Sequence, residues 1–329
     1  MVLRMVFGPR DLERTRFAAG ADPLWELVLA GHQLGSRQPA ARYRSWRAKA
    51  IRRIADADEQ AAVDRLTTIA PPRGDFPDFL TPAPATTDFD AGCAALACTP
   101  GTRLRADLER AFPGGRVPTW LRSLGDGEAD QVRRLVGSLR TAYRLLVAPV
   151  RQRVDEVVSG DRAARLQTVS RQGIGRVLST LPGVCGWDGT TLALQYPHRR
   201  TVDLGGRGLV LVPSAFCTGA PVSLIDPELP PVLVYPASLP PVRSARGLAP
   251  LVALVGRTRA ECLVALRDSR TTTGLARDLG VSVGTASKHA AVLRGSGLVS
   301  TTRSGATAWH GLTELGRSVL AGVGGHPEA

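Results

Sequence analysis

Lysine, aromatic residues and long apolar runs are all scarce in this chain. Only Lys49 and Lys288 are lysines among 42 Lys and Arg residues, so arginine supplies almost all of the net charge of +13. Aromatic residues make up 5% of the chain, and no apolar run approaches the length of a membrane-spanning helix. Residues 1–7 are too short for the core of a signal peptide. We therefore expect a cytoplasmic protein that has no membrane partner.

Cysteine is scarce as well. The five cysteines are odd in number, are scattered along the chain and form no Cys-X-X-Cys pair. This pattern argues against a disulfide framework and against a zinc site, because both need paired thiols. We expect reduced thiols that pack as small apolar side chains. The five residues are Cys93, Cys98, Cys185, Cys217 and Cys262.

The sequence contains no combination of residues that is typical of an enzyme site. Cys217 follows His198 closely enough for a Cys–His pair to be conceivable, but a packed cysteine and a solvated hairpin explain these two residues better. The glycine-rich segment 205–208 lacks the lysine and the helix start of a phosphate-binding loop, so we expect a tight turn there. We predict no catalytic residues, no cofactor and no enzymatic activity.

The positive charge is compatible with a nucleic-acid partner. From Leu251 onward the chain has nine Lys or Arg and five Asp or Glu, so most of the excess lies upstream of that point. The preference for arginine over lysine also fits a general bias in composition. Charge therefore supports nucleic-acid binding without establishing it.

The spacing of apolar residues divides the upstream part of the chain into a mainly helical segment and a segment of short strands. Residues 1–182 show mainly helical spacing, with a weak strand pattern at residues 2–7 and with Asp22 expected to cap a helix. Residues 183–236 contain short apolar runs around turns such as Asp188-Gly189. This second pattern predicts a small antiparallel sheet.

A proline-rich joint is expected at residues 237–250, because seven prolines lie between Pro227 and Pro250. The joint separates a helical and sheet-containing region, residues 1–248, from a C-terminal domain, residues 251–322. We expect the N-terminal region to regulate or dimerise the protein. The predicted fold class is α+β.

Residues 271–313 are the most informative segment. They contain two short helical patterns joined by Gly280-Val281-Ser282, and a strand–turn–strand pattern follows at once. This order predicts a winged helix-turn-helix, in which one helix enters a groove of DNA. The second helix of the domain is expected to be capped by Thr272 or Thr273.

The third helix is expected to run from its cap Ser282 to Arg294. Ala286, Ala290 and Leu293 recur at i, i+4 and i+7 on this helix, so we expect them to face the core. A first helix is expected at residues 257–267, the wing strands at residues 298–303 and 306–312, and a final helix at residues 314–320.

The opposite side of the third helix is small, polar and basic. Gly284 and Ala291 would let the helix lie close to base edges, while Lys288 offers a positive charge. Further candidates flank this face, cap the helices or lie near the tip of the wing, where they could reach phosphates. The predicted DNA-contacting residues are Thr272, Ser282, Gly284, Thr285, Ser287, Lys288, His289, Ala291, Arg294, Thr302, Arg303 and Ser304.

Three segments of this domain carry a specific resemblance. Residues 275–282 read LARDLGVS, residues 286–289 read ASKH and residues 293–299 read LRGSGLV. They resemble the ArsR/SmtB group of winged-helix regulators. The resemblance implies a homodimer that binds a double-stranded DNA operator and usually represses transcription.

The upstream region carries a second resemblance. Residues 11–17, 23–26, 77–82 and 206–214 resemble the domain of unknown function that precedes this module in long actinobacterial members of the group. This resemblance supplies no chemistry. A pocket between the helical part and the sheet is where we expect an unknown small-molecule effector to bind, if the protein has one.

The chain departs from metal-sensing members of the group. Their thiol pair falls near the start of the second helix, where this chain has Thr271 and Thr273, and the final helix lacks their carboxylate and histidine pairs. Because threonine offers neither thiolate nor imidazole, we predict no metal site. The alternative function is a ligand-binding or enzymatic N-terminal domain, with the winged helix as a protein-interaction adaptor.

Overall fold

The computed structural model describes residues 1–36, 40–83, 86–114, 117–237, 249–266, 269–304 and 307–322. The chain forms two compact units, Met1–Pro240 and Pro241–Ala329, which are called here the N-terminal and C-terminal units. Most of the proline-rich joint expected at residues 237–250 lies outside the described residues. None of the described helices has the length and apolar character needed to cross a membrane.

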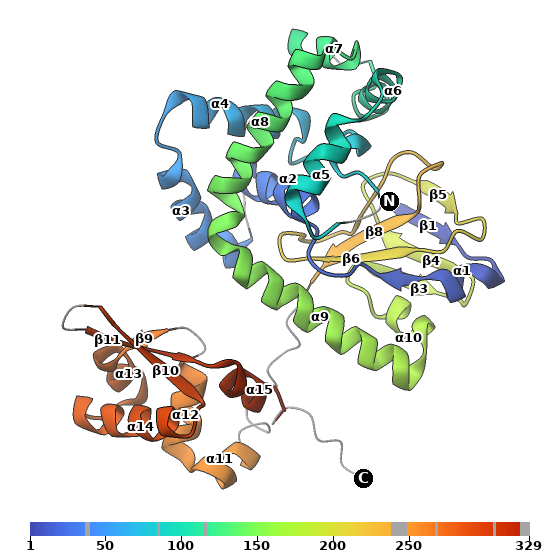
Figure 1. Ribbon diagram of the computed structural model, residues 1–329. Helices are drawn as coiled ribbons and strands as arrows, with labels where there is room; N and C mark the ends of the chain where they lie inside the picture. Colours follow the sequence, from blue (N-terminus) through green and yellow to red (C-terminus); the bar gives the residue numbers. More distant parts are fainter. Residues whose placement is uncertain are drawn as a thin grey trace. The chain divides into compact units, whose positions relative to one another are not determined.

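Helices make up most of the first two thirds of the N-terminal unit, as the spacing predicted (Figure 1). Asp22 caps α2 by accepting hydrogen bonds from Leu24 N and Trp25 N, which confirms its predicted role. The helices are α1 (Pro9–Arg14), α2 (Pro23–Gly35), α3 (Arg44–Arg53), α4 (Ala57–Ile69), α5 (Phe89–Ala97), α6 (Gly101–Ala111), α7 (Thr119–Gly125), α8 (Ala129–Leu146), α9 (Arg151–Gln172) and α10 (Ile174–Ser179), with short 3₁₀ turns at Ala41–Tyr43, Asp78–Leu80 and Ala148–Val150.

Two four-stranded sheets complete the N-terminal unit. Their orders are β3-β4-β1-β5 and β2-β6-β8-β7. The strands are β1 (Val2–Val6), β2 (Arg16–Phe17), β3 (Val184–Trp187), β4 (Thr191–Gln195), β5 (Arg200–Asp203), β6 (Val210–Ser214), β7 (Val222–Ser223) and β8 (Val232–Pro236).

The prediction of a small antiparallel sheet within residues 183–236 is wrong in two respects. The strands divide between two sheets, and both sheets are mixed: β1 pairs in parallel with β5, and β6 pairs in parallel with both β2 and β8. The local hairpin signal at Asp188-Gly189 did produce an antiparallel β3–β4 pair. Pairing with the distant strands β1 and β2 leaves no local pattern in the sequence, so local spacing could not reveal it.

The sheet β2-β6-β8-β7 is buried on both faces. Along β8, Val232 and Val234 pack in the core formed with the helices, whereas Leu233 and Tyr235 pack in the core shared with the other sheet. A strand covered on both sides needs apolar residues at successive positions, which explains the continuous apolar run of β8. Figure 1 shows helices gathered on one side of the sheets and α9 running along them to α10.

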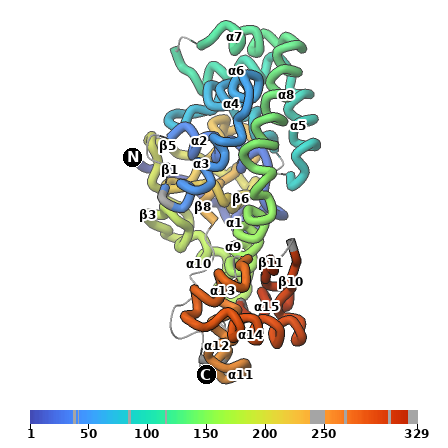
Figure 2. Tube along the Cα trace, turned by 90° about the vertical axis from the view of Figure 1, so that its left-hand side faces the viewer, coloured from blue at the N-terminus to red at the C-terminus, as the bar shows by residue number. Residues whose placement is uncertain are grey.

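The C-terminal unit is a cluster of helices with a small sheet, as predicted (Figure 2). Its three strands have the order β10-β11-β9. The elements are α11 (Ala249–Val255), α12 (Arg257–Ala265), β9 (Arg270–Thr271), α13 (Thr272–Leu279), α14 (Val283–Gly295), β10 (Val299–Ser304), β11 (Thr307–Leu312) and α15 (Glu314–Gly322).

The start of α13 differs from the sequence prediction. Its N-cap is Thr271, whose hydroxyl accepts a hydrogen bond from Gly274 N at 3.0 Å, and neither Thr272 nor Thr273 is the cap. Thr271 also belongs to β9 and pairs with Trp309 of β11. This pairing holds Thr271 in the extended conformation that an N-cap requires.

Candidate nucleic-acid interface

The turn between α13 and α14 has the geometry that the sequence indicated. Gly280 adopts φ +65°, a left-handed conformation that glycine adopts without steric cost. Val281 N then donates to Ala276 O at 3.0 Å. Ser282 caps α14, because its Oγ accepts a hydrogen bond from Thr285 N at 3.1 Å. These contacts fix the direction in which α14 leaves the turn.

One face of α14 is anchored in the core of the C-terminal unit. Ala286, Ala290 and Leu293 are each 1% exposed or less, as their spacing predicted. They pack in one cluster with Leu263 of α12 and Leu275 of α13. The two alanines leave room for the neighbouring helices to approach closely, so α14 is held against α12 and α13.

The other face of α14 is open within the C-terminal unit. Gly284, Ser287, Lys288, Ala291 and Arg294 are exposed. A methyl group added at Gly284 would have Ser282 Oγ, 3.9 Å away, as its nearest neighbour among the described residues. This face therefore has little side-chain bulk at Gly284 and Ala291, and hydroxyl and cationic side chains flank these two positions.

The remaining predicted residues of this helix lie at the edge of the open face. Ser282 is exposed, and its Oγ lies 2.8 Å from Thr285 Oγ1, so the two hydroxyls hydrogen-bond to each other. Thr285 and His289 are half-buried. The sequence reasoning missed Val283 and Val292, which are 49% and 48% exposed. A helical wheel alone does not show how far neighbouring elements cover such residues.

The wing is formed by β10 and β11. Thr302 pairs with Trp309, and Arg303 pairs with Ala308. Thr302 and Arg303 are exposed near the end of the hairpin. The backbone of Ser304 ends β10, while its side chain lies outside what the structure describes. Trp309 is 44% exposed and was not among the predicted contacts, although an aromatic residue on a wing is a signal that could have been used.

Thr272 differs from the predicted residues of α14 because its hydroxyl contacts a buried side chain of the wing. His310 of β11 is 5% exposed, and its Nε2 lies 2.9 Å from Thr272 Oγ1. Its Nδ1 lies 2.9 Å from Thr301 Oγ1. Burial, and secondly the charge of Arg294, lower the pKa of His310 below its ordinary value. His310 thus joins the wing to the first turn of α13.

The helices of this unit also match a known family model. Residues 257–301 match the model described as "Bacterial regulatory protein, arsR family". The matched part of the C-terminal unit is therefore an arsR-type helix-turn-helix. This result confirms the resemblance to the ArsR/SmtB group, and it supports a DNA-binding transcriptional regulator. The comparison with curated proteins and the comparison with solved structures each gave no match.

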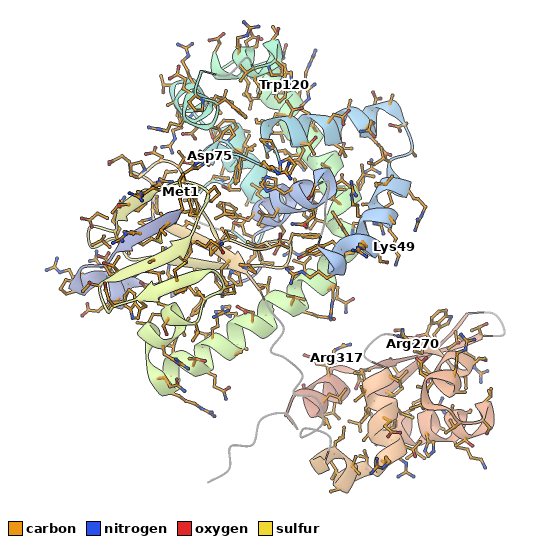
Figure 3. All side chains as sticks on the ribbon, turned by 180° about the vertical axis from the view of Figure 1, so that it is seen from behind. Met1, Lys49, Asp75, Trp120, Arg270 and Arg317 are labelled. Atoms are coloured by element: carbon orange, nitrogen blue, oxygen red, sulfur yellow. The ribbon has the colours of Figure 1, made fainter. Side chains whose placement is uncertain are left out.

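The matched range places the arsR-type domain on the elements described above. It covers α12, α13, α14 and the first residues of β10, so it includes the turn at Gly280 and the open face of α14. Most of the wing lies beyond it. Figure 3 labels Arg270, in β9 before α13, and Arg317, whose Nη1 donates to Leu312 O and ties α15 to the end of β11.

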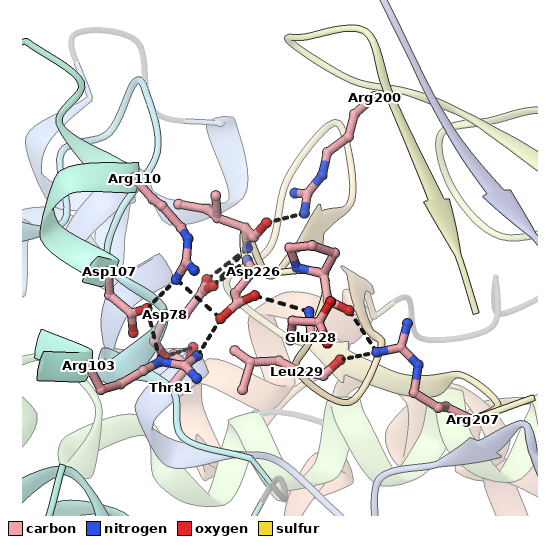
Figure 4. Close-up of polar contacts among 12 residues, drawn as sticks. Asp78, Thr81, Arg103, Asp107, Arg110, Arg200, Arg207, Asp226, Glu228 and Leu229 are labelled. Carbon is pink, nitrogen blue, oxygen red and sulfur yellow. Dashed lines mark hydrogen bonds and ion pairs between the residues drawn. The ribbon is translucent and has the colours of Figure 1, made fainter. Parts of the chain in front are cut away.

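Cys217, one member of the Cys–His pair considered from the sequence, is buried in the N-terminal unit. Burial, together with the nearby Glu26, raises the pKa of the Cys217 thiol to about 12, so this residue is not a thiolate at neutral pH. Arg200 donates to Leu224 O, and it also donates to Ile225 O, as Figure 4 shows. Within the described residues, no group of three or more His, Cys, Asp and Glu side chains is arranged to hold a metal ion.

Proposed function

We propose that the protein is a sequence-specific transcriptional regulator that acts as a homodimeric repressor in the cytoplasm. In this proposal α14 enters the major groove of an operator, and the wing lies on the flanking backbone. The supporting observation is the contrast between the two faces of α14. Ala286, Ala290 and Leu293 anchor one face, while Gly284, Lys288 and Ala291 leave the other open.

The open face suits a DNA duplex in shape and in chemistry. Gly284 and Ala291 project little beyond the helix backbone, so α14 can approach base edges closely. Ser287 and Thr285 carry hydroxyls that can contact bases or phosphates. Within the described part of the chain, the exposed Lys288 takes part in no ion pair, so its charge is available for a phosphate.

We further propose that two copies bind half-sites about one helical turn apart, or a multiple of that distance. Leu254 of α11 is 73% exposed and Leu315 of α15 is 55% exposed. Large apolar side chains that stay open in an isolated unit favour contact with another protein surface. A second copy of the chain is the partner that this proposal assigns to them.

We also propose that the chain acts without catalysis. The buried, protonated thiol of Cys217 is unsuited to nucleophilic attack, which supports this reading of the one Cys–His combination that the sequence offered. The adaptor function considered for the winged helix has no comparable observation in its favour.

The direct test measures binding of the full chain to a fluorescent duplex from its own upstream region. Lys288→Ala and Arg303→Ala should each weaken binding and reduce the slope of log affinity against log salt by about 1, because each removes one phosphate contact. Thr285→Ala or Ser287→Ala should instead change the preferred sequence. Fluorescence anisotropy at several salt concentrations measures all four variants.

Lys49 gives a matched control, since it is the other lysine of the chain and is exposed on α3 (Figure 3). Lys49→Ala removes the same charge from the N-terminal unit, so it should leave the salt slope unchanged. If Lys288→Ala and Lys49→Ala bind DNA with equal affinity and equal slopes, the open face of α14 is not the DNA-binding surface.

A further inference from the structure

A cavity of about 580 Å³ lies within the N-terminal unit. One side is formed by α2, which contributes Leu29, His32 and Gln33. The other sides come from residues 72–78 and from the segments that precede and follow β7. Asp75, labelled in Figure 3, is one of the lining residues. The volume falls in the range of sites for small organic molecules.

His32, one of the lining residues, carries an unpartnered polar atom. The Nε2 atom of His32 is buried and has no hydrogen-bond partner among the described residues. The ring of His32 packs edge-on against Phe76, with 5.7 Å between the ring centroids. Burial lowers the pKa of His32 to about 4, so the imidazole is neutral at physiological pH. A buried donor or acceptor without a partner is costly, and a bound molecule would satisfy it.

The walls of the cavity are held in place by other buried polar groups. Gln33 Nε2 donates to Phe216 O and to Thr218 Oγ1, at 3.3 and 2.8 Å. Glu26, at the same helix, accepts hydrogen bonds from Ala215 N and Phe216 N, at 2.8 and 3.0 Å. The segment after β6 is therefore fixed to α2 before any molecule enters.

The segment after β7 is fixed in the same way. Asp78 accepts hydrogen bonds from Ile225 N at 2.8 Å and from Asp226 N at 2.7 Å. Asp226 in turn pairs with Arg103 and Arg110, each at 3.1 Å (Figure 4). Because these loops are ordered by the protein itself, a molecule that enters would not have to order them.

The chemistry of the lining limits what can bind. Leu29, Phe76 and Ile225 supply apolar surface, while Gln33 and Asp78 already have partners in the protein. We propose that this cavity binds a neutral, mainly apolar organic molecule of about 15 to 30 non-hydrogen atoms, with a carbonyl group that accepts a hydrogen bond from His32 Nε2. Arg73 and Asp75 carry opposite charges, so they favour neither an anion nor a cation.

This inference does not depend on DNA binding by the C-terminal unit. The probe is Prodan, a neutral naphthalene ketone that emits at shorter wavelength in apolar surroundings. The full chain should bind Prodan saturably with a blue shift in emission. His32→Phe keeps an aromatic ring beside Phe76 and removes the nitrogen, so it should weaken binding about three- to tenfold, as expected for one lost hydrogen bond.

Ala220→Trp places a large side chain in the lining and should abolish saturable binding. Ala94→Trp adds the same side chain on the exposed surface of α5 and should bind Prodan as the unchanged protein does. Circular dichroism confirms that each variant is folded. If Ala220→Trp unfolds, Val222→Phe replaces it, because it also enlarges a lining side chain.

Any one of three results would overturn the inference: no saturable Prodan binding by the unchanged protein, unchanged affinity in His32→Phe, or saturable binding that persists in folded Ala220→Trp. DNA binding is measured on the same preparations. Prodan binding without DNA binding would reject the proposed function and leave this inference standing. DNA binding without Prodan binding would reject this inference and leave the proposed function standing.

Discussion

At the scale of single residues, two buried titratable side chains connect segments that are distant in the sequence. His310 joins β11 to Thr272 and Thr301 in the C-terminal unit. Glu26 joins α2 to the segment after β6 in the N-terminal unit, through Ser214 Oγ and two backbone amides. Burial lowers the pKa of His310 and raises the pKa of Glu26, so it disfavours the charged form of both side chains. Because one group is a base and the other an acid, the two units respond to pH in opposite ways.

His310→Leu should destabilise the C-terminal unit by about 1 to 3 kcal/mol, because it leaves the hydroxyls of Thr272 and Thr301 without their shared partner. The pKa of His310 is lowered in the folded chain, so the unfolded chain binds the proton more readily. The stability that His310 contributes is therefore present above pH 6.5 and is lost as the pH falls through the folded pKa. Urea unfolding from pH 5 to pH 8 measures both effects.

His289→Leu is the control for this variant, since His289 is half-buried on α14 and would not be expected to link the wing to α13. If His310→Leu unfolds at the same urea concentration as the unchanged protein at every pH, the link between the wing and α13 contributes nothing to stability.

Glu26 has the opposite dependence on pH. Burial raises its pKa to about 7, from an ordinary value of 4.5, despite the hydrogen bonds from Ala215, Phe216 and Ser214. A raised folded pKa stabilises the folded state fully below pH 4.5, and this contribution is lost as the pH rises through 7. Burial also raises the pKa of Asp22 and that of Asp78 to about 6, which adds to the same trend.

Glu26→Gln should therefore flatten the fall in stability of the N-terminal unit between about pH 4.5 and pH 7. Glu13→Gln, on the exposed side of α1, serves as the control and should leave the slope as it is. Unfolding of the full chain is followed by tryptophan fluorescence, to which Trp25 of α2 contributes. An unchanged slope in Glu26→Gln would show that Glu26 is ionised at the same pH in both states.

At the scale of elements, α14 packs one face in the core and presents the other face for the proposed DNA binding. A substitution at Gly284 tests these two roles separately. Gly284→Leu should keep or raise the stability of the C-terminal unit by up to about 1 kcal/mol, because leucine favours a helix over glycine and has open space there. The same change should weaken DNA binding, since the leucine side chain would hold α14 away from the bases.

Gly295→Ala is the matched control, because Gly295 also lies in α14 and has no described neighbour within 4 Å of an added methyl group. It should raise helix stability without affecting DNA binding. Thermal unfolding and fluorescence anisotropy on the same samples test both variants. Full DNA affinity in Gly284→Leu would mean that α14 does not approach the bases closely.

Elements whose signals are local could be predicted from the sequence. The helical spacing of Ala286, Ala290 and Leu293 correctly predicted the buried face of α14. The turn at Gly280 correctly predicted where α14 begins. The N-cap of α13 could not be settled in this way, because three successive threonines can all cap a helix. Pairing of Thr271 with Trp309 selects the first of them. His310 was missed for the same reason, since only strand pairing brings it to Thr272.

At the scale of the whole molecule, the class α+β was predicted correctly and the sheet arrangement was not. Parallel pairing of β1 with β5 joins Leu3 to Arg200, and such distant partners leave no trace in local spacing. Burial of one sheet on both faces also hides the alternation that would mark its strands. The cavity beside His32 depends on this arrangement, so its lining could not be named from the sequence.

The central claim is that the open face of α14 and the wing meet DNA. Photocrosslinking of the full chain to an operator that carries iodouracil, followed by mass spectrometry, tests it most directly. We expect crosslinked peptides from α14 (Val283–Gly295) and from β10 (Val299–Ser304). Crosslinks found only in the N-terminal unit, with none in these two elements, would contradict the account.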